Sequence, residues 1–206
     1  MIKAFGVLYE TGWRPRRSLM FASWGSEEYG LIGSQEWVEE HLTLLKANSI
    51  VYVNCDVGVS GNWTFSPSGT PNMREIMHEI TKLVDNPRIN VDGINIKTIY
   101  DNMMQKQNKP PGATPNFPGV GSGSDFAPFL QQVGTSIINI GWSPHPSVGG
   151  YPVYHSIYET LDLVETFLDP GFHIHRQTAL MCGLCKCSTV VCKLIILKFN
   201  STRAAL

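Results

Sequence analysis

The sequence has few charged residues and almost no excess of either sign. Charged side chains make up 16% of the 206 residues, and 16 basic residues against 17 acidic ones leave a formal charge of −1. Proteins that attract nucleic acids or anionic membranes through their overall field usually carry a clear basic excess. The composition therefore gives no sign of a nucleic-acid partner, and we expect none.

Long apolar runs are also missing. The most apolar window, residues 179–199, is interrupted by Lys186, Lys193 and Lys198, whereas a membrane-spanning helix needs about 20 mostly apolar residues. The first residues contain no apolar run of signal-peptide length. We expect no membrane span within this chain.

Cysteine is scarce and unevenly placed. Of the five cysteines, Cys55 stands alone and four lie between residues 182 and 192. An odd, clustered set is poorly suited to a disulfide framework for the whole domain. The Cys182, Cys185 and Cys187 run also lacks a fourth ligand at zinc-finger spacing, which argues against a structural zinc there.

Strand-like and helix-like segments alternate along the chain. Apolar or β-branched runs predict strands at 18–25, 50–56 and 135–142, and helical periodicity predicts helices that end near residue 11, span 29–45 and 72–84, and fill most of the chain after 160. Proline and glycine predict a long irregular loop at 107–124. The alternation predicts an α/β fold, a mixed sheet with helices on both faces.

Acidic residues follow two of the predicted strands. Glu27 and Glu28 come after the first strand, and Asp56 ends the second. Ligands of such sheets bind at the carboxyl ends of strands, and clustered carboxylates repel one another unless a cation or a shared proton is present. Neighbouring side chains leave the backbone in different directions, so one carboxylate can bind a metal while the other acts as a general base. The alternative is that the Glu27–Glu28 pair only favours the dipole of the next helix.

Six histidines are candidates for a nitrogen ligand. His145 and His155 lie in loops after the last predicted strand, close to the expected site. The others are less suitable, because they lie on predicted helix surfaces or are spaced two apart on a helix and face different ways: His41, His78, His173 and His175.

Four runs make the sequence recognisable: GWRPRRSLMFASWGSEEYGLIGSQEWVEE, YVNCDVGVSGNWT, GSGSDFAPF and GYPVYHSIYETLDLVETFLDPGF. They closely resemble the glutamate carboxypeptidase II family of zinc exopeptidases, which includes the N-acetylated alpha-linked acidic dipeptidases. The runs occur in the family's order and cover most of the chain. The resemblance implies a three-layer zinc-exopeptidase-like fold that hydrolyses C-terminal peptide bonds of small peptides with a metal-activated water.

The resemblance also assigns roles to residues. It makes Glu27 the general acid/base, Glu28 a ligand of one zinc, Asp56 a ligand of the other and His155 a further zinc ligand. Residues implied to contact the substrate are Leu31 and Tyr154 in a pocket for the C-terminal residue, and Gly123 and Ser124 in a backbone turn. Glu36 and Glu39 match carboxylates that hold Ca²⁺ in the family, and Asn62 matches a glycosylation site.

The sequence departs from the family's pattern in three respects. The family's two-zinc site uses one more histidine and a bridging aspartate, both expected upstream of residue 1. In the family, paired arginines favour substrates whose penultimate residue is acidic. At the matching positions this sequence has residues 138–141, INIG, without arginine. The tail from Cys182 onward also diverges. We therefore expect weak zinc binding by the chain alone, and no strong acidic specificity.

The resemblance implies an organisation for the complete protein. Residues 1–170 match part of a catalytic domain, and 171–206 match the start of a helical dimerisation region with a divergent tail. Complete members of the family are homodimeric type II membrane glycoproteins whose catalytic domain faces the outside of the cell.

Two other functions remain open. A non-catalytic relative that binds a protein partner, as the transferrin receptor does, is disfavoured by the retention of Glu27, Glu28, Asp56 and His155. A serine hydrolase is disfavoured because residues 141–145, GWSPH, lack the second glycine of a nucleophile elbow.

Overall fold

The computed structural model describes residues 1–88, 93 and 95–190, with side chains up to residue 187. It contains both helices and strands, as the sequence predicts, although one predicted strand is absent. In chain order they are α1 (Ile2–Glu10), the 3₁₀ turn η1 (Glu27–Tyr29), α2 (Ile32–Glu40), α3 (Leu42–Asn48), β1 (Val51–Asn54), β2 (Thr64–Phe65), β3 (Ser68–Gly69), η2 (Pro71–Met73), α4 (Arg74–Leu83), α6 (Ile99–Lys106), α7 (Phe126–Pro128), the π-helical turn η3 (Phe129–Val133), β4 (Ser136–Asn139), β5 (Trp142–Ser143), η4 (Pro146–Val148), α8 (Leu161–Leu163), the π-helical turn η5 (Val164–Leu168) and α9 (His173–Val190).

The described strands form a small mixed sheet and a separate ribbon. In the sheet β4 lies between β1, to which it is parallel, and β3, to which it is antiparallel, and Val53 is paired with Ile138. The ribbon pairs β2 with β5. The strand predicted at 50–56 is confirmed as β1, although it lies at the edge of the described sheet and β4 is central.

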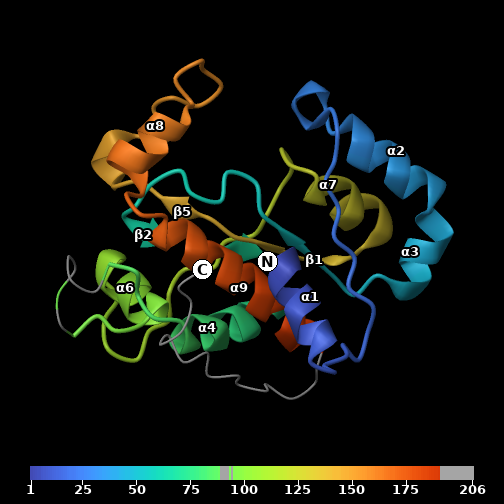
Figure 1. Cartoon of the computed structure of the whole chain (residues 1–206), viewed down its shortest axis with the longest axis horizontal. Coiled ribbons are helices and arrows are strands. Elements are labelled where there is room, and N and C mark those ends of the chain that lie inside the picture. The colour runs from blue at the N-terminus through green and yellow to red at the C-terminus, as the bar shows by residue number, and fades with distance from the viewer. Residues whose placement is uncertain (89–92, 94, 191–206) are drawn as a thin grey trace.

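Successive side chains of β4 enter different parts of the core, as the alternation of a strand requires. Ile137 packs in the cluster formed with α2, α3 and α7, while Ile138 packs in the cluster formed with α4, α6 and α9. Figure 1 shows α2, α3 and α7 at the right, α4 and α6 at the lower left, and α9 running through the centre. The predicted mixed α/β arrangement is confirmed, and the complete three-layer fold stays a prediction.

The strand predicted at residues 18–25 is wrong. Within the described part of the chain this segment is irregular, and its residues are half-buried or exposed. Two of its aromatic residues pack through their side chains: Phe21 contacts Phe5, and Trp24 contacts Trp37 and donates a hydrogen bond to Tyr52. An apolar run shows that a segment packs against the core, but it does not show that a neighbouring strand pairs with it.

The other predicted elements are largely confirmed. The helix at 29–45 is divided at His41 into α2 and α3, the helix at 72–84 corresponds to η2 and α4, and residues 107–124 form an irregular loop. The placement of His78 on a helix surface was wrong, because this side chain is only 6% exposed.

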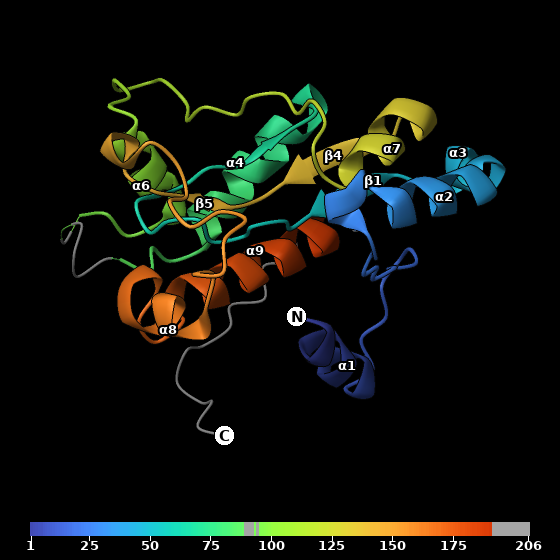
Figure 2. The ribbon, with the colours of Figure 1, turned by 90° about the horizontal axis from the view of Figure 1, so that it is seen from above.

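The two ends of the described chain lie near each other. Helix α1 buries none of its residues, and Figure 2 shows it as the outermost element on the side of α9. Helix α9 contributes Ile174, Met181 and Cys185 to the larger core cluster. The chain leaves the helical conformation between η5 and α9. The domain boundary at residue 170 and a separate region from 171 stay predictions, and the tail at 191–206 lies outside the described residues. No helix in the described part of the chain is both long and apolar enough to cross a bilayer.

Candidate active site

The predicted acidic residues line one cavity of about 450 Å³. Glu27 and Glu28 reach it from η1, and Asp56 reaches it from the segment after β1. Asp125, just before α7, lines the same cavity. The convergence expected at the carboxyl end of β1 is therefore present, although Glu27 and Glu28 follow an irregular segment rather than a strand.

Backbone geometry fixes the turn that carries Glu27 and Glu28. Ser26 and Leu31 flank η1 with φ angles of 57° and 61°, a region that residues other than glycine seldom adopt. Gly33 passes so close to the backbone of Gly25 that an added Cβ would lie 2.4 Å from its carbonyl oxygen. Such local strain is common at functional sites and needs support from surrounding structure.

Glu28 and His155 are in direct contact. The Nε2 atom of His155 lies 2.8 Å from Oε2 of Glu28. The contact joins two residues that are far apart in the sequence. His155 has a φ angle of 57°, and its ring stacks on Tyr154 with 3.8 Å between centroids. Both side chains of the pair are more than half exposed. Water therefore weakens their attraction, and the contact is worth little for stability by itself.

Glu27 lies among other carboxylates. Partial burial raises its pKa, and the negative charges of Asp56, Glu28 and Asp125 raise the pKa further, while His155 opposes this effect. A carboxyl group with a raised pKa holds a proton more readily near neutral pH, as a general acid/base requires.

Asp125 was missed by the sequence analysis. Burial raises its pKa, a hydrogen bond with Ser34 lowers it, and the charge of Asp56 raises it. Its Oδ1 atom is buried and has no hydrogen-bond partner among the described residues. The available signal was its position directly after Gly123 and Ser124, which the resemblance had already placed against the substrate.

The turn predicted to contact the substrate is held against the sheet. Asn54 at the end of β1 donates through Nδ2 to Oγ of Ser124 and to Oδ1 of Asn139, both at 2.9 Å. Ser124 is buried, whereas Gly123 is exposed and has a φ angle of 93°. Leu31 is half-buried beside η1, and Tyr154 is exposed next to His155. Their predicted roles in substrate binding stay predictions.

The described residues fit the proposed zinc site only in part. Glu28 and His155 bring a carboxylate oxygen and an imidazole nitrogen together, which are suitable zinc donors. Among residues 1–88, 93 and 95–190, however, no group of three or more His, Cys, Asp or Glu side chains is placed to hold a metal ion. Asp56 lines the cavity without joining the pair as a third ligand.

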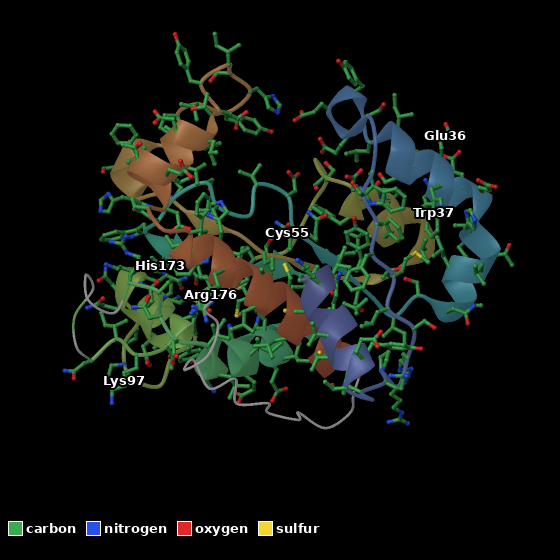
Figure 3. The ribbon with its side chains drawn as sticks, viewed as in Figure 1. Glu36, Trp37, Cys55, Lys97, His173 and Arg176 are labelled. Carbon is green, nitrogen blue, oxygen red and sulfur yellow. The ribbon has the colours of Figure 1, made fainter. Side chains whose placement is uncertain are left out.

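The other predicted sites lie away from this cavity. Glu36 and Glu39 are exposed on α2, where Glu39 accepts a hydrogen bond from Gln35, and Figure 3 shows Glu36 on the outer side of the helix. Asn62 is half-buried in the segment before β2. Ca²⁺ binding and glycosylation at these residues stay predictions.

Cys55 stands alone in the sequence, but in the fold it lies beside Cys182. The Cys182 S–H group on α9 donates a hydrogen bond to the Cys55 sulfur, which lowers the pKa of Cys55 to about 7 against the opposing effect of burial. The same contact and burial raise the pKa of Cys182.

Comparison with known proteins gives a consistent result. The sequence profile of Peptidase family M28 matches residues 1–169. The chain is 38% identical to the aminopeptidase NAALADL1 of Rattus norvegicus over 88% of the chain and 25% of that protein. It is 38% identical to the glutamate carboxypeptidase 2 homolog of Caenorhabditis briggsae over 75% of the chain and 20% of that protein, and 37% identical to the probable glutamate carboxypeptidase LAMP1 of Arabidopsis thaliana over 86% of the chain and 24% of that protein.

The chain thus spans about a quarter of the length of the curated relatives it matches. The family resemblance seen in the four sequence runs is confirmed, since the profile covers most of the chain. On these matches, the chain belongs to peptidase family M28 and, within it, to the glutamate carboxypeptidase group.

Proposed function

We propose that this chain is part of the catalytic domain of a zinc-dependent exopeptidase. The observation that carries the proposal is the placement of Glu27, Glu28 and Asp56 around one cavity, with His155 in contact with Glu28. Family membership supports a peptidase in general. The arrangement adds a candidate proton carrier beside candidate metal donors.

In this proposal each residue has a distinct task. Glu28, Asp56 and His155 would hold zinc together with donors from outside the described residues. The chemistry supplied by bound zinc is polarisation of the scissile carbonyl and activation of a water molecule. Glu27, whose pKa is raised by burial and by its acidic neighbours, would accept a proton from water and return it to the leaving amine.

We also propose which end of the peptide is cleaved. The relatives bear the names of both aminopeptidases and carboxypeptidases. We infer cleavage at the C-terminal side, with the terminal residue between Leu31, Tyr154 and the turn at Gly123 and Ser124. A small peptide with a blocked amino terminus would then be cleaved, and one with an amidated carboxyl terminus would resist. The reverse preference would contradict this polarity.

A chimera tests the catalytic role of this chain's own residues. Residues 1–169 replace the matching segment of the rat relative, and peptide hydrolysis is measured with Glu27 and with Glu27→Gln. We expect an active chimera whose kcat falls about 10²- to 10⁴-fold in the variant, because the proton carrier is lost. Glu40→Gln, an exposed residue of α2 with no proposed role, is the matched control. A folded chimera that retained full activity after Glu27→Gln would contradict the proposal.

Zinc binding by the chain alone tests the proposed metal ligands separately from peptide hydrolysis. Because the described residues supply no group of three donors, titration calorimetry should show weak binding. His155→Ala should weaken the binding further, while His145→Ala, in a neighbouring loop, should leave it unchanged. Two tightly bound zinc ions per chain would contradict this expectation.

The remaining features are proposals for the complete protein. They are a homodimer, Ca²⁺ at Glu36 and Glu39, glycosylation at Asn62 and a membrane-anchored extracellular location. They rest on the resemblance to the glutamate carboxypeptidase II family.

A further inference from the structure

Two cysteines far apart in the sequence meet at the edge of the candidate site. Cys55 follows β1 and is exposed, whereas Cys182 is buried on α9, and both are free thiols. The side chains of Cys55 and Cys182 lie close enough for a side-chain hydrogen bond between the two thiol groups. Their sulfur atoms are therefore near neighbours, which is the first geometric requirement for a disulfide.

A second observation places the Cys55 sulfur on the same face of α9. A Cβ added to Gly58 would lie 3.0 Å from Sγ of Cys55 and 3.3 Å from a methyl carbon of Thr178. Thr178 precedes Cys182 by four residues and so shares its helix face. Figure 3 shows Cys55 beside α9.

The pair is accessible from one side. Cys55 and Cys182 both line the cavity of about 450 Å³, together with Phe21 and Lys186. Lys186 lies one turn beyond Cys182 on α9 and lines the same cavity. Among the described cysteines, Cys185 and Cys187 do not line this cavity, and Cys55 is the exposed member of the pair that an entering reagent can reach.

We propose that Cys55 and Cys182 are a reversible disulfide site that a low-molecular-weight disulfide oxidises. The Cys55 thiolate attacks one sulfur of the reagent, forms a mixed disulfide and releases one thiolate. Cys182 then loses its proton to water and attacks the Cys55 sulfur, which releases the second thiolate. Two protein thiols are oxidised, and one disulfide molecule is reduced to two thiols. The bond ties the carboxyl end of β1, directly before Asp56, to α9.

Peptide mapping of the full chain tests the proposal directly. The purified chain is equilibrated with oxidised and reduced glutathione, free thiols are alkylated, and peptides are analysed without reduction. We expect a linked peptide joining residues 55 and 182, a mass lower by about 2 Da, and three of the five thiols left for alkylation. Reduction should restore all five. The measurement needs neither metal nor substrate, so it is independent of the proposed peptidase activity.

Matched variants distinguish this pair from other cysteines. Cys55→Ser changes an exposed residue and should abolish the linked peptide without altering the circular dichroism spectrum. Cys187→Ser, on the same helix, should leave the linked peptide intact. A disulfide of Cys182 with another cysteine, or a mixed disulfide that stays on Cys55 without closing, would overturn the proposal.

Discussion

Glu27 lies near three other carboxylates, and this environment affects its pKa. Burial has the largest effect on its pKa, and the charges of Asp56, Glu28 and Asp125 add to it. Each neighbouring charge favours the protonated form of Glu27. A change at one neighbour should therefore be detectable at Glu27 without any change in the fold.

Replacement of Asp125 tests this coupling. In Asp125→Asn the carboxylate is lost, so the pKa of Glu27 should fall toward its ordinary value. Carbon-13 NMR titration of the side-chain carboxyl groups measures the change. Glu40→Gln on α2 is the control, and it should leave the pKa of Glu27 as it is in the unmodified chain. An unchanged Glu27 pKa in Asp125→Asn would show that the two carboxylates are not coupled.

His78 gives a second residue-scale prediction. Burial lowers its pKa, as do the charges of Arg74 and Lys82, against opposing contributions from the Pro115 backbone and Glu79. The unfolded chain therefore binds a proton at His78 more readily than the folded chain. The free energy of unfolding should fall as pH drops below about 6.5, the ordinary value for histidine.

Urea unfolding of the chain and of His78→Gln, at about pH 7.5 and about pH 5, isolates this contribution. The stability advantage of the unmodified chain over the variant should shrink at the lower pH. An advantage that grows on acidification would mean that the folded state favours the charged imidazole.

The sequence predicted some site residues and missed others for identifiable reasons. Glu27, Glu28 and Asp56 could be found because they follow apolar runs at positions where ligands of α/β folds bind. The resemblance named Glu28 and His155 as zinc ligands, which stays a prediction, and the structure places the two side chains 2.8 Å apart. The contact of Cys55 with Cys182 joins residues 127 positions apart, and no local pattern indicates it.

Among the elements, α9 depends on a buried carboxylate at its start. Asp169 is 3% exposed and accepts hydrogen bonds from the backbone N–H groups of Ile174 and His175. Its Oδ2 atom also lies 2.7 Å from Nδ1 of His175. This arrangement satisfies N–H groups that the first turn of a helix leaves unpaired.

Loss of this carboxylate should destabilise the fold. Asp169→Ala leaves buried donors unsatisfied, and we expect the free energy of unfolding to fall by about 2–4 kcal/mol. Urea denaturation measures the change. Asp162→Ala on the exposed helix α8 is the control, with an effect within about 0.5 kcal/mol. Equal effects of the two changes would show that Asp169 is not needed to start α9.

The central strand β4 should be as sensitive to the loss of a buried side chain as the start of α9 is. Ile138 is fully buried among side chains of α4, α6 and α9. Ile138→Ala should lower the free energy of unfolding by about 2–5 kcal/mol, through lost burial and the cavity left behind. Ile157 is 88% exposed, so Ile157→Ala should have almost no effect. Similar losses for both variants would contradict this description of the core.

Element prediction succeeded for long helical periodicity and for the strand at 50–56, and it failed for the apolar run at 18–25. The helix at 72–84 has a clear apolar face, and the structure places α4 there. The run at 18–25 is as apolar as a strand, yet aromatic contacts of Phe21 and Trp24 hold it without strand pairing. Strand partners are set by tertiary structure, which the local sequence does not contain.

For the whole molecule, the fold explains how distant segments reach one cavity. Helices pack against different faces of β4, and this holds β1, η1 and the turn at Gly123 together at one end of the sheet. The described residues nevertheless supply only part of a metal-binding set. The chain also covers about a quarter of its curated relatives, so its chemistry is best tested in the context of a complete relative.

Anomalous X-ray diffraction from crystals of the chimera, grown with zinc, shows whether this chain's own residues hold the metal. We expect an anomalous peak in contact with the side chains of Glu28 and His155, next to Glu27, in place of the Glu28–His155 hydrogen bond. Zinc bound elsewhere, with that hydrogen bond intact, would contradict it.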